Sequence, residues 1–295
     1  MLMRTLVLTG ISVSFELVLV LLPTVCVMKE IIRNTLFECG LELNRLVRVN
    51  ERARHLNLDE VTNEDYFLCS HPRTGNTWTR LILAGLIQPD LEEINLDTID
   101  ALVPDLNESL SQGIVPRRVN GKRFMKLHQC AFDVFKKVIY NVRDGRDAEV
   151  STYQYASRAL GFEGSFEDFL FNRERHVFGL WHEHVREALA LQAKHPDRIF
   201  ILKYEDLKSR FVETVEALVT FAGLPVSRQR IEALQQITSI DRVKKAATSD
   251  KQDARKVHTL NSGKVGGASA FFTPQTERYF VGAAYHEMKA LGYIE

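Results

Sequence analysis

The feature that most constrains this 295-residue chain is a strand-turn-helix pattern between Tyr66 and Leu86. Four apolar residues at 66–69 lead into a polar loop with one glycine, Gly75, and an apolar-periodic segment begins at Trp78. A turn of this kind presents backbone N–H groups to an anion. The loop adds four side chains with hydrogen-bond donors: Arg73, Thr74, Asn76 and Thr77. The pattern predicts a phosphate-binding loop in an α/β fold.

The loop differs from the common nucleotide-triphosphate loop. That loop has two glycines separated by four residues, and Lys-Ser/Thr follows the second glycine. Here Asn76 follows the single glycine. Turns of the same shape also connect strands to helices without binding any ligand. The function of this loop therefore depends on what else the chain places beside it.

A second strand-turn-helix pattern starts at Val138. Five strand-like residues, 138–142, are followed by Arg143 and then by a helical segment that contains Ser151. Arg143 is thus predicted at the carboxyl end of a strand, where open α/β sheets bind their ligands. Ser151 lies about two helical turns further on, and an arginine fork plus a hydroxyl suits a phosphate dianion. The alternative is a surface turn with an ion pair between Arg143 and Asp147.

Together the two patterns resemble the sulfotransferase family that uses 3′-phosphoadenosine 5′-phosphosulfate (PAPS). The run His-Pro-Arg-Thr-Gly-Asn-Thr-Trp at 71–78 is similar to the family's 5′-phosphosulfate loop, Tyr-Pro-Lys-Ser-Gly-Thr-Thr-Trp. The run that starts at Arg143 and contains Ser151 is similar to the family's 3′-phosphate motif, Arg-Asn/Asp-x-x-Asp-x-x-Val-Ser-x-Tyr. The resemblance extends from about Asp65 to about Glu277 and implies the three-layer, P-loop-kinase-like fold of that family.

The resemblance also implies roles for individual residues. Residues 123–128 resemble the family's strand that ends in Lys-Thr-His, so His128 is the expected catalytic base. Arg73 and Lys126 are expected to stabilise charge on the transferring group, although a guanidinium, unlike the family's usual lysine, stays charged. Tyr204 matches the family's aromatic residue near the adenine. The residues expected to hold PAPS are Arg73, Thr74, Gly75, Asn76, Thr77, Trp78, Arg143, Ser151, Tyr204, Gly263 and Lys264.

The chain departs from the family near its end. The family's Arg-Lys-Gly-x-x-Gly-Asp-Trp corresponds to a run that begins with Asn261 and Ser262, so two cations for the 3′-phosphate are missing. Lys264 or the backbone at Gly263 could substitute, or the co-substrate could be held less tightly. Two alternatives to a PAPS-dependent transferase therefore stay open. One is a nucleotide or nucleoside kinase of related fold, and the other is a catalytically weakened protein that binds PAPS or its product.

The predicted reaction needs positioning and charge stabilisation, as phosphoryl transfer does, and a base with a suitable pKa, which histidine provides near neutral pH. The acceptor is expected to be a hydroxyl or amine of a small molecule, a lipid or a saccharide. No metal is expected, because the pair His182 and His184 has no obvious third ligand nearby. Basic and acidic residues balance at 38 each, so no nucleic-acid partner is expected. The four cysteines show no ligand spacing and are interpreted as reduced thiols.

The N-terminal segment 5–28 is largely apolar and long enough to span a bilayer, which suggests either a membrane anchor or a start assigned upstream of Met28. The arginines and lysines that follow it would leave the catalytic domain in the cytoplasm. The predicted organisation is an apolar segment at 1–28, an amphipathic helical lead-in at 29–64 and one α/β domain at 65–295, with a mostly parallel sheet flanked by helices. Residues 90–107 are expected to form a surface connection, and residues 240–262 a mobile loop.

Overall fold

The computed structural model describes residues 61–111, 116–129, 135–173, 178–239 and 265–295, with the single residues Phe132, His176 and Arg242. All of them belong to one compact unit, Arg54–Glu295. The prediction for residues 1–28, nearly all of those for 29–64 and 240–262, and those for Gly263 and Lys264 lie outside the described residues. No helix within the described ranges is long and apolar enough to span a membrane.

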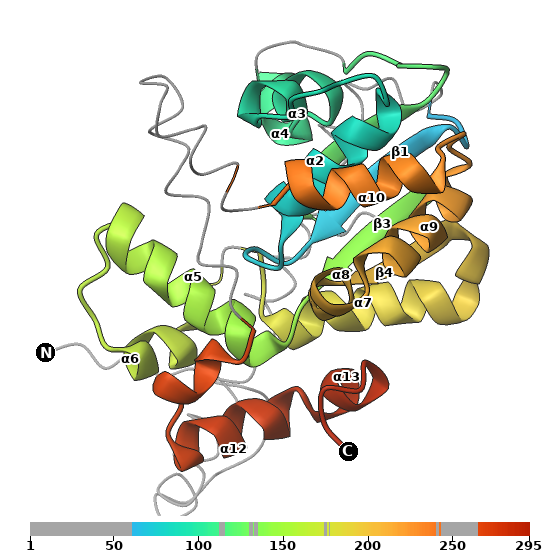
Figure 1. The fold of residues 1–295 in the computed structure, drawn as a ribbon. Helices are drawn as coiled ribbons and strands as arrows, with labels where there is room; N and C mark the ends of the chain where they lie inside the picture. The colour runs from blue at the N-terminus through green and yellow to red at the C-terminus, as the bar shows by residue number, and fades with distance from the viewer. Residues whose placement is uncertain are drawn as a thin grey trace, which may run out of the picture. The chain divides into compact units, whose positions relative to one another are not determined.

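Strands and helices alternate along the described residues (Figure 1). The strands are β1 (Asp65–Ser70), β2 (Arg123–Leu127), β3 (Lys137–Val142) and β4 (Ile199–Lys203). The first helices are α2 (Asn76–Ile87), α3 (Leu96–Leu102), α4 (Leu106–Ser111), α5 (Gly145–Ala159), α6 (Phe166–Phe171) and α7 (Trp181–Lys194). The later helices are α8 (Tyr204–Ser209), α9 (Phe211–Ala222), α10 (Arg228–Ile237), α12 (Pro274–Ala283) and α13 (Tyr285–Ala290), with short 3-10 turns η3 (Pro196–Arg198) and η6 (Gly267–Ala270).

The four described strands form one sheet in the order β2-β1-β3-β4, and every neighbouring pair is parallel. The predicted parallel sheet is therefore observed. In a parallel sheet all strands end at the same edge, so the residues that follow β1, β2, β3 and β4 are brought together. Those residues are His71, His128, Arg143 and Tyr204.

Helices cover both faces of the sheet, because successive side chains of a strand point to opposite faces. On one face, Tyr66 and Leu68 of β1 pack in a core cluster with α2, α9 and α10. On the other face, the ring of Phe67 stacks on Phe135 with centroids 3.9 Å apart, and Tyr140 of β3 contacts α7. Figure 1 shows α7 running along this second face. The central strands β1 and β3 are consequently buried almost throughout, as expected of a parallel sheet.

The surface connection predicted for residues 90–107 is wrong. This segment contains all of α3 and the start of α4, and it buries Leu96, Ile99 and Val103 against α2. Most acidic residues of the segment are exposed, whereas Asp105 is partly buried and pairs with Lys126. A capping box at Asn95, in which Asn95 and Thr98 exchange hydrogen bonds, begins α3.

The start of β1 carries a buried charge cluster. Asp65 is fully buried, and its carboxylate accepts hydrogen bonds from Arg123 (2.8 Å), Arg118 (2.8 Å) and the Thr62 N–H (2.7 Å). Burial alone would raise the pKa of Asp65, but these donors outweigh burial and lower it. The cluster ties β1 to β2 at the end of the sheet opposite the strand carboxyl ends.

We expect Asp65→Asn to lower the free energy of unfolding by about 3–5 kcal/mol, because it leaves the buried Arg123 without its counter-charge. Urea denaturation measures this loss. The stabilising contribution of Asp65 is present above the pKa of the unfolded aspartate and is lost as pH falls through the lower folded value. The control is Glu64→Gln, which removes a half-exposed ion pair with Lys122 and should cost about 1 kcal/mol or less. Equal losses of stability in the two variants would contradict the assignment of Asp65 as the counter-charge of the buried Arg123.

Candidate active site

The loop between β1 and α2 is held in an unusual backbone conformation. Arg73 and Gly75 both have positive φ, 66° and 97°. The Thr74 hydroxyl fixes the loop from inside by donating to the carbonyls of His71 (2.9 Å) and Asn141 (3.4 Å). The loop thus turns sharply, and the first turn of α2 follows it directly.

The first turn of α2 is suited to bind an anion. Gly75 is its N-cap and provides no side-chain cap, and the first turn contains no acidic residue. The N–H groups of a helix's first turn have no partner within the helix, and the helix dipole favours negative charge there. A Cβ at Gly75 would lie 2.5 Å from Cδ2 of Tyr204, so only glycine allows the loop and this ring to approach each other.

A cavity of about 490 Å³ opens at this edge of the sheet. Of the eleven residues expected to hold the co-substrate, nine are among the described residues. Eight of these line the cavity, whereas Thr74 is buried beneath the loop. The three expected catalytic residues, His128, Arg73 and Lys126, also line it. Parallel strand ends and one helix N-terminus therefore bring the separate sequence motifs to one place.

Arg143, Ser151 and Arg73 connect the two motifs. Nε of Arg73 donates to Oγ of Ser151 at 3.3 Å, across 78 residues of sequence. The guanidinium of Arg143 lies 4.9 Å from the ring centroid of Tyr204, a cation-π contact. Arg143 also forms the ion pair with Asp147 (3.2 Å) that the sequence allowed, but both side chains are buried and do not form a surface turn.

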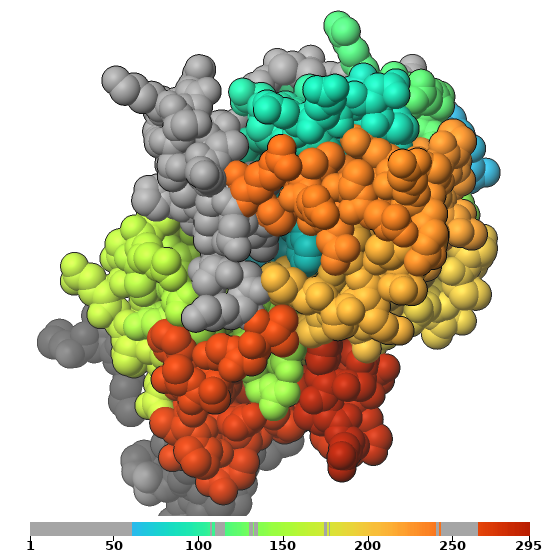
Figure 2. Space-filling view, in the orientation of Figure 1, coloured from blue at the N-terminus to red at the C-terminus, as the bar shows by residue number. Residues whose placement is uncertain are grey.

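Asp147 is a residue that the sequence analysis did not assign to the site. Its carboxylate accepts hydrogen bonds from the backbone N–H groups of Gly266 (2.8 Å) and Ala268 (3.0 Å). It therefore attaches the segment beyond residue 264 to the start of α5, next to Arg143. Figure 2 shows the C-terminal helices (red) beside the segment that contains α5 (yellow-green). The spacing of four from Arg143 was the available signal, since i and i+4 share a helix face.

His128 follows β2 and faces the cavity. Its Nδ1 lies 2.8 Å from the carbonyl oxygen of Ser70. A carbonyl only accepts, so the neutral ring carries its proton on Nδ1 and leaves the lone pair on Nε2. The backbone carbonyl of His128 accepts from Nε2 of His184 (2.8 Å), whose Nδ1 is bonded to the Tyr140 hydroxyl (2.6 Å). Both ring nitrogens of His184 are thus hydrogen-bonded, Nε2 to the His128 backbone and Nδ1 to Tyr140, which leaves neither of them for a metal.

Cations outnumber acidic groups in the cavity. The cationic residues that line it are Arg73, Arg80, Lys126 and Arg143, and the acidic ones are Asp100 and Glu108. Lys126 is paired with Asp105 at 2.5 Å, and Arg80 with Asp100 at 2.8 Å. Burial lowers the pKa of Arg73 to about 10, so it remains a cation at neutral pH. The local field attracts an anion although the chain as a whole has no net charge.

The lining residues that the sequence analysis missed include Arg80, Thr152 and Tyr155. The guanidinium of Arg73 lies 5.1 Å from the ring centroid of Tyr155. Arg80 is four residues after Asn76, and Tyr155 is four after Ser151, so helical spacing places each on the face of a residue that was assigned. Trp78 also lines the cavity, with its ring edge-on to Tyr204 at 5.6 Å.

Burial lowers the pKa of His128 to about 3, with a smaller contribution from the nearby charge of Lys126. We therefore expect the ring to remain neutral from pH 8 down to pH 5, whereas an unfolded histidine titrates near 6.5. Nuclear magnetic resonance of the ring nitrogens, assigned by comparison with a His128→Asn variant, measures this directly. A midpoint for His128 near pH 6.5 would show that the ring is not desolvated as described.

Comparison with known proteins identifies the family. Residues 63–292 match the sequence profile of the sulfotransferase domain. Human sulfotransferase 4A1 is 27% identical over 194 residues, which cover 60% of this chain and 68% of that protein. Bovine sulfotransferase 1A1 is 28% identical over 204 residues, which cover 63% and 68%. The chain spans about two thirds of the length of these curated relatives.

Solved structures agree on the fold. Mouse sulfotransferase SULT7A1 complexed with PAP superposes with a TM-score of 0.58 at 23% identity, covering 77% of this chain and 84% of that one. Retinol dehydratase in complex with androsterone and the inactive cofactor PAP gives a TM-score of 0.61 at 23% identity, covering 82% and 85%. These likenesses confirm the three-layer α/β fold that the two sequence motifs implied.

Proposed function

Because the chain belongs to the sulfotransferase domain family, and is a sulfotransferase by that membership, we propose that it transfers a sulfuryl group from PAPS to a small acceptor. The acceptor would carry a hydroxyl or an amine. The observation that supports this proposal most strongly is the single cavity that collects the anion-binding loop, the Arg143 and Ser151 pair and His128.

The donor side of the cavity would bind PAPS. The α2 N-terminus and Arg73 suit the 5′-phosphosulfate, because both favour negative charge. Arg143 and Ser151 suit the 3′-phosphate, which accepts a guanidinium fork and a hydroxyl. The rings of Trp78 and Tyr204 provide faces for the adenine, and base-aromatic stacking is worth about 1–3 kcal/mol per base in nucleic-acid complexes. A cavity of about 490 Å³ lies within the range that small-molecule sites occupy.

His128 would act as the base. Its unprotonated Nε2 would take the proton from the acceptor as the acceptor oxygen or nitrogen attacks sulfur. The bond from sulfur to the bridging phosphate oxygen would break in line with that attack, and the leaving phosphate would gain negative charge. The charges of Arg73 and Lys126 would stabilise this group. Such positioning and electrostatics account for most of the catalysis in the related phosphoryl transfers.

The kinase alternative is disfavoured by the loop itself. A P-loop kinase holds Mg²⁺ through the hydroxyl that follows Gly-Lys, whereas here Asn76 stands after Gly75 and donates to Oγ of Ser70 (2.9 Å). The weakened-binder alternative rests on Asn261 and Ser262, which lie outside the described residues. Its distinguishing outcome is co-substrate binding without turnover.

The type of acceptor, the start of the domain and its location in the cell are also part of this proposal. Retinol dehydratase was solved with androsterone and PAP, and we propose an acceptor of comparable size, a small hydroxylated molecule, for this chain. Lipid and saccharide acceptors remain predictions, as do a domain that begins near residue 65, attachment to a membrane through residues 5–28 and a cytoplasmic catalytic domain.

A turnover assay tests the proposal. The full-length protein is incubated with PAPS and pools of phenols, aliphatic alcohols, sterols and amines, and release of 3′,5′-ADP is followed by liquid chromatography and mass spectrometry. We expect acceptor-dependent release of 3′,5′-ADP without added Mg²⁺. Phosphoryl transfer from Mg²⁺-ATP to the same acceptors, with no use of PAPS, would contradict the proposal.

A further inference from the structure

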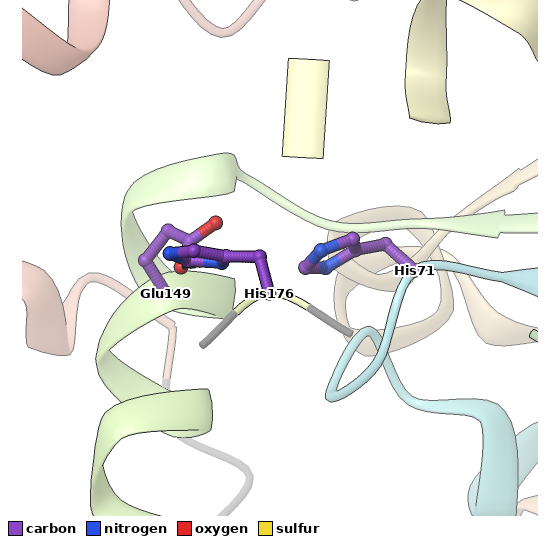
Figure 3. A group of neighbouring side chains, drawn as sticks. All are labelled: His71, Glu149 and His176. Atoms are coloured by element: carbon purple, nitrogen blue, oxygen red, sulfur yellow. Dashed lines mark ion pairs between the residues drawn. The ribbon is translucent and has the colours of Figure 1, made fainter. Parts of the chain in front are cut away.

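Three titratable side chains from distant parts of the sequence meet outside the cavity. They are His71 of the anion-binding loop, Glu149 of α5 and His176, which lies between α6 and α7. One potential ligand atom from each lies within 4.8 Å of the other two. Figure 3 shows the three side chains reaching toward one another from three separate segments. None of them lines the cavity proposed to bind PAPS.

The cluster is buried, and its polar atoms are not satisfied. His71 is 2% exposed, Glu149 1% and His176 8%. Among the described residues, no group makes a hydrogen bond of ordinary length and angle with Nδ1 of His71, with either ring nitrogen of His176 or with Oε2 of Glu149. Nδ1 of His176 lies 3.6 Å from Oε2 of Glu149, outside hydrogen-bond distance. Weaker contacts are present, from His71 to the Pro72 backbone and from His176 to the Phe169 backbone and to Glu149. Buried polar atoms nearly always have a hydrogen bond of ordinary geometry, so four without one in a single cluster need an explanation.

The ring of His71 has the hydrogen bond that is typical of a metal-binding histidine. Its Nε2 lies 3.2 Å from the carbonyl oxygen of Gly179. The carbonyl can only accept, so the neutral ring donates from Nε2 and its Nδ1 carries the lone pair. Histidines that bind metals usually donate their other ring N–H to a carboxylate or to a backbone carbonyl in this way. Gly179 is three residues after His176, so the same turn contributes both the orienting carbonyl and a second ligand.

We propose that His71, Glu149 and His176 bind a divalent transition-metal ion, with Zn²⁺ the best match. Two imidazoles and one carboxylate form a donor set that zinc uses in proteins. Ligand atoms at about 2.0–2.1 Å from a tetrahedral ion are about 3.3 Å apart, so separations of up to 4.8 Å must shorten by as much as about 1.5 Å to close around it. A water molecule completes the coordination.

The role that follows from this position is structural. The three ligands join the loop that precedes Arg73, the helix that carries Ser151 and the turn before α7. The ion would therefore fix the anion-binding loop against α5 without contacting the substrates. This inference does not depend on the proposed reaction, because it concerns residues that do not line the cavity.

Zinc binding by the untagged full-length protein tests the inference. The protein is stripped with a chelator, incubated with ZnCl2, passed through gel filtration and measured by inductively coupled plasma mass spectrometry. We expect about one zinc per chain. Glu149→Gln and His176→Asn should each weaken zinc affinity by more than about 10–100-fold, the loss that changes to second-shell partners already cause. The matched control His182→Ala, a nearby histidine outside the cluster, should bind zinc as the wild type does.

X-ray absorption at the zinc edge of the wild-type protein is the second measurement, and it does not require a variant to fold. Two imidazole ligands with oxygen completing the shell support the inference. No stoichiometric zinc, a sulfur ligand, or unchanged binding by both Glu149→Gln and His176→Asn would overturn it.

Discussion

Replacing His128 with asparagine is expected to lower kcat for sulfuryl transfer by about 10²–10⁴-fold, the usual contribution of a general base. The asparagine amide can still donate to the Ser70 carbonyl that Nδ1 contacts at 2.8 Å, so the fold around β2 is retained. The variant has no lone pair in the place of Nε2, and only proton removal is lost. Steady-state kinetics with PAPS and an identified acceptor measure the change.

The binding of 3′,5′-ADP distinguishes a catalytic role from a structural one. His128→Asn should bind this product as tightly as the wild type, because the role proposed for the ring is to contact the acceptor and not the nucleotide. His286→Ala, which changes an exposed histidine of α13, is the control and should leave kcat unchanged. An unaltered kcat in His128→Asn would remove this residue from its assigned role.

The second large effect is expected at Arg143. Its replacement by alanine should weaken 3′,5′-ADP binding by about 10–150-fold, since hydrogen bonds to charged groups contribute about 1.5–3 kcal/mol. Asp147 would keep its two backbone donors, Gly266 and Ala268, so the C-terminal segment should stay attached. Isothermal titration calorimetry of 3′,5′-ADP and of 5′-AMP measures the effect.

Selectivity is the informative readout for Arg143. The loss should be large for 3′,5′-ADP and small for 5′-AMP, which lacks the 3′-phosphate. Arg158→Ala provides the control, because that exposed arginine near the end of α5 hydrogen-bonds only to Gln154 among the described residues. Equal losses for both nucleotides would mean that Arg143 supports the fold of the site without contacting the 3′-phosphate.

The sheet and the position of the site could be predicted from local sequence because each motif is short and contiguous. Residues 66–69 and 138–142 are apolar runs that end at a polar turn, and both proved to be central parallel strands. In such a sheet, strand ends converge whatever the intervening sequence contains. His128, Arg143 and Tyr204 therefore share an edge although 76 positions separate the first and last.

The contacts that depend on tertiary packing could not be predicted in this way. The acidic character of residues 90–107 suggested a connection, yet Leu96 and Ile99 have the helical spacing that buries α3 against α2. Asp147 was interpreted only as a partner of Arg143, because its two backbone donors lie about 120 residues further on. The cluster of His71, Glu149 and His176 has no ligand spacing at all in the sequence and arises only from the fold.

The central claim is that the site recognises the 3′-phosphate of PAPS. Its most direct test is a thermal-shift titration of the full-length protein with 3′,5′-ADP, 5′-AMP and Mg²⁺-ATP. A ligand at about 100 times its Kd adds about 2.7 kcal/mol to the stability of the folded state, which raises Tm by a few degrees for a domain of this size. The account predicts this shift with 3′,5′-ADP and a much smaller one with 5′-AMP. Stabilisation by Mg²⁺-ATP alone, or by none of the three, would contradict it.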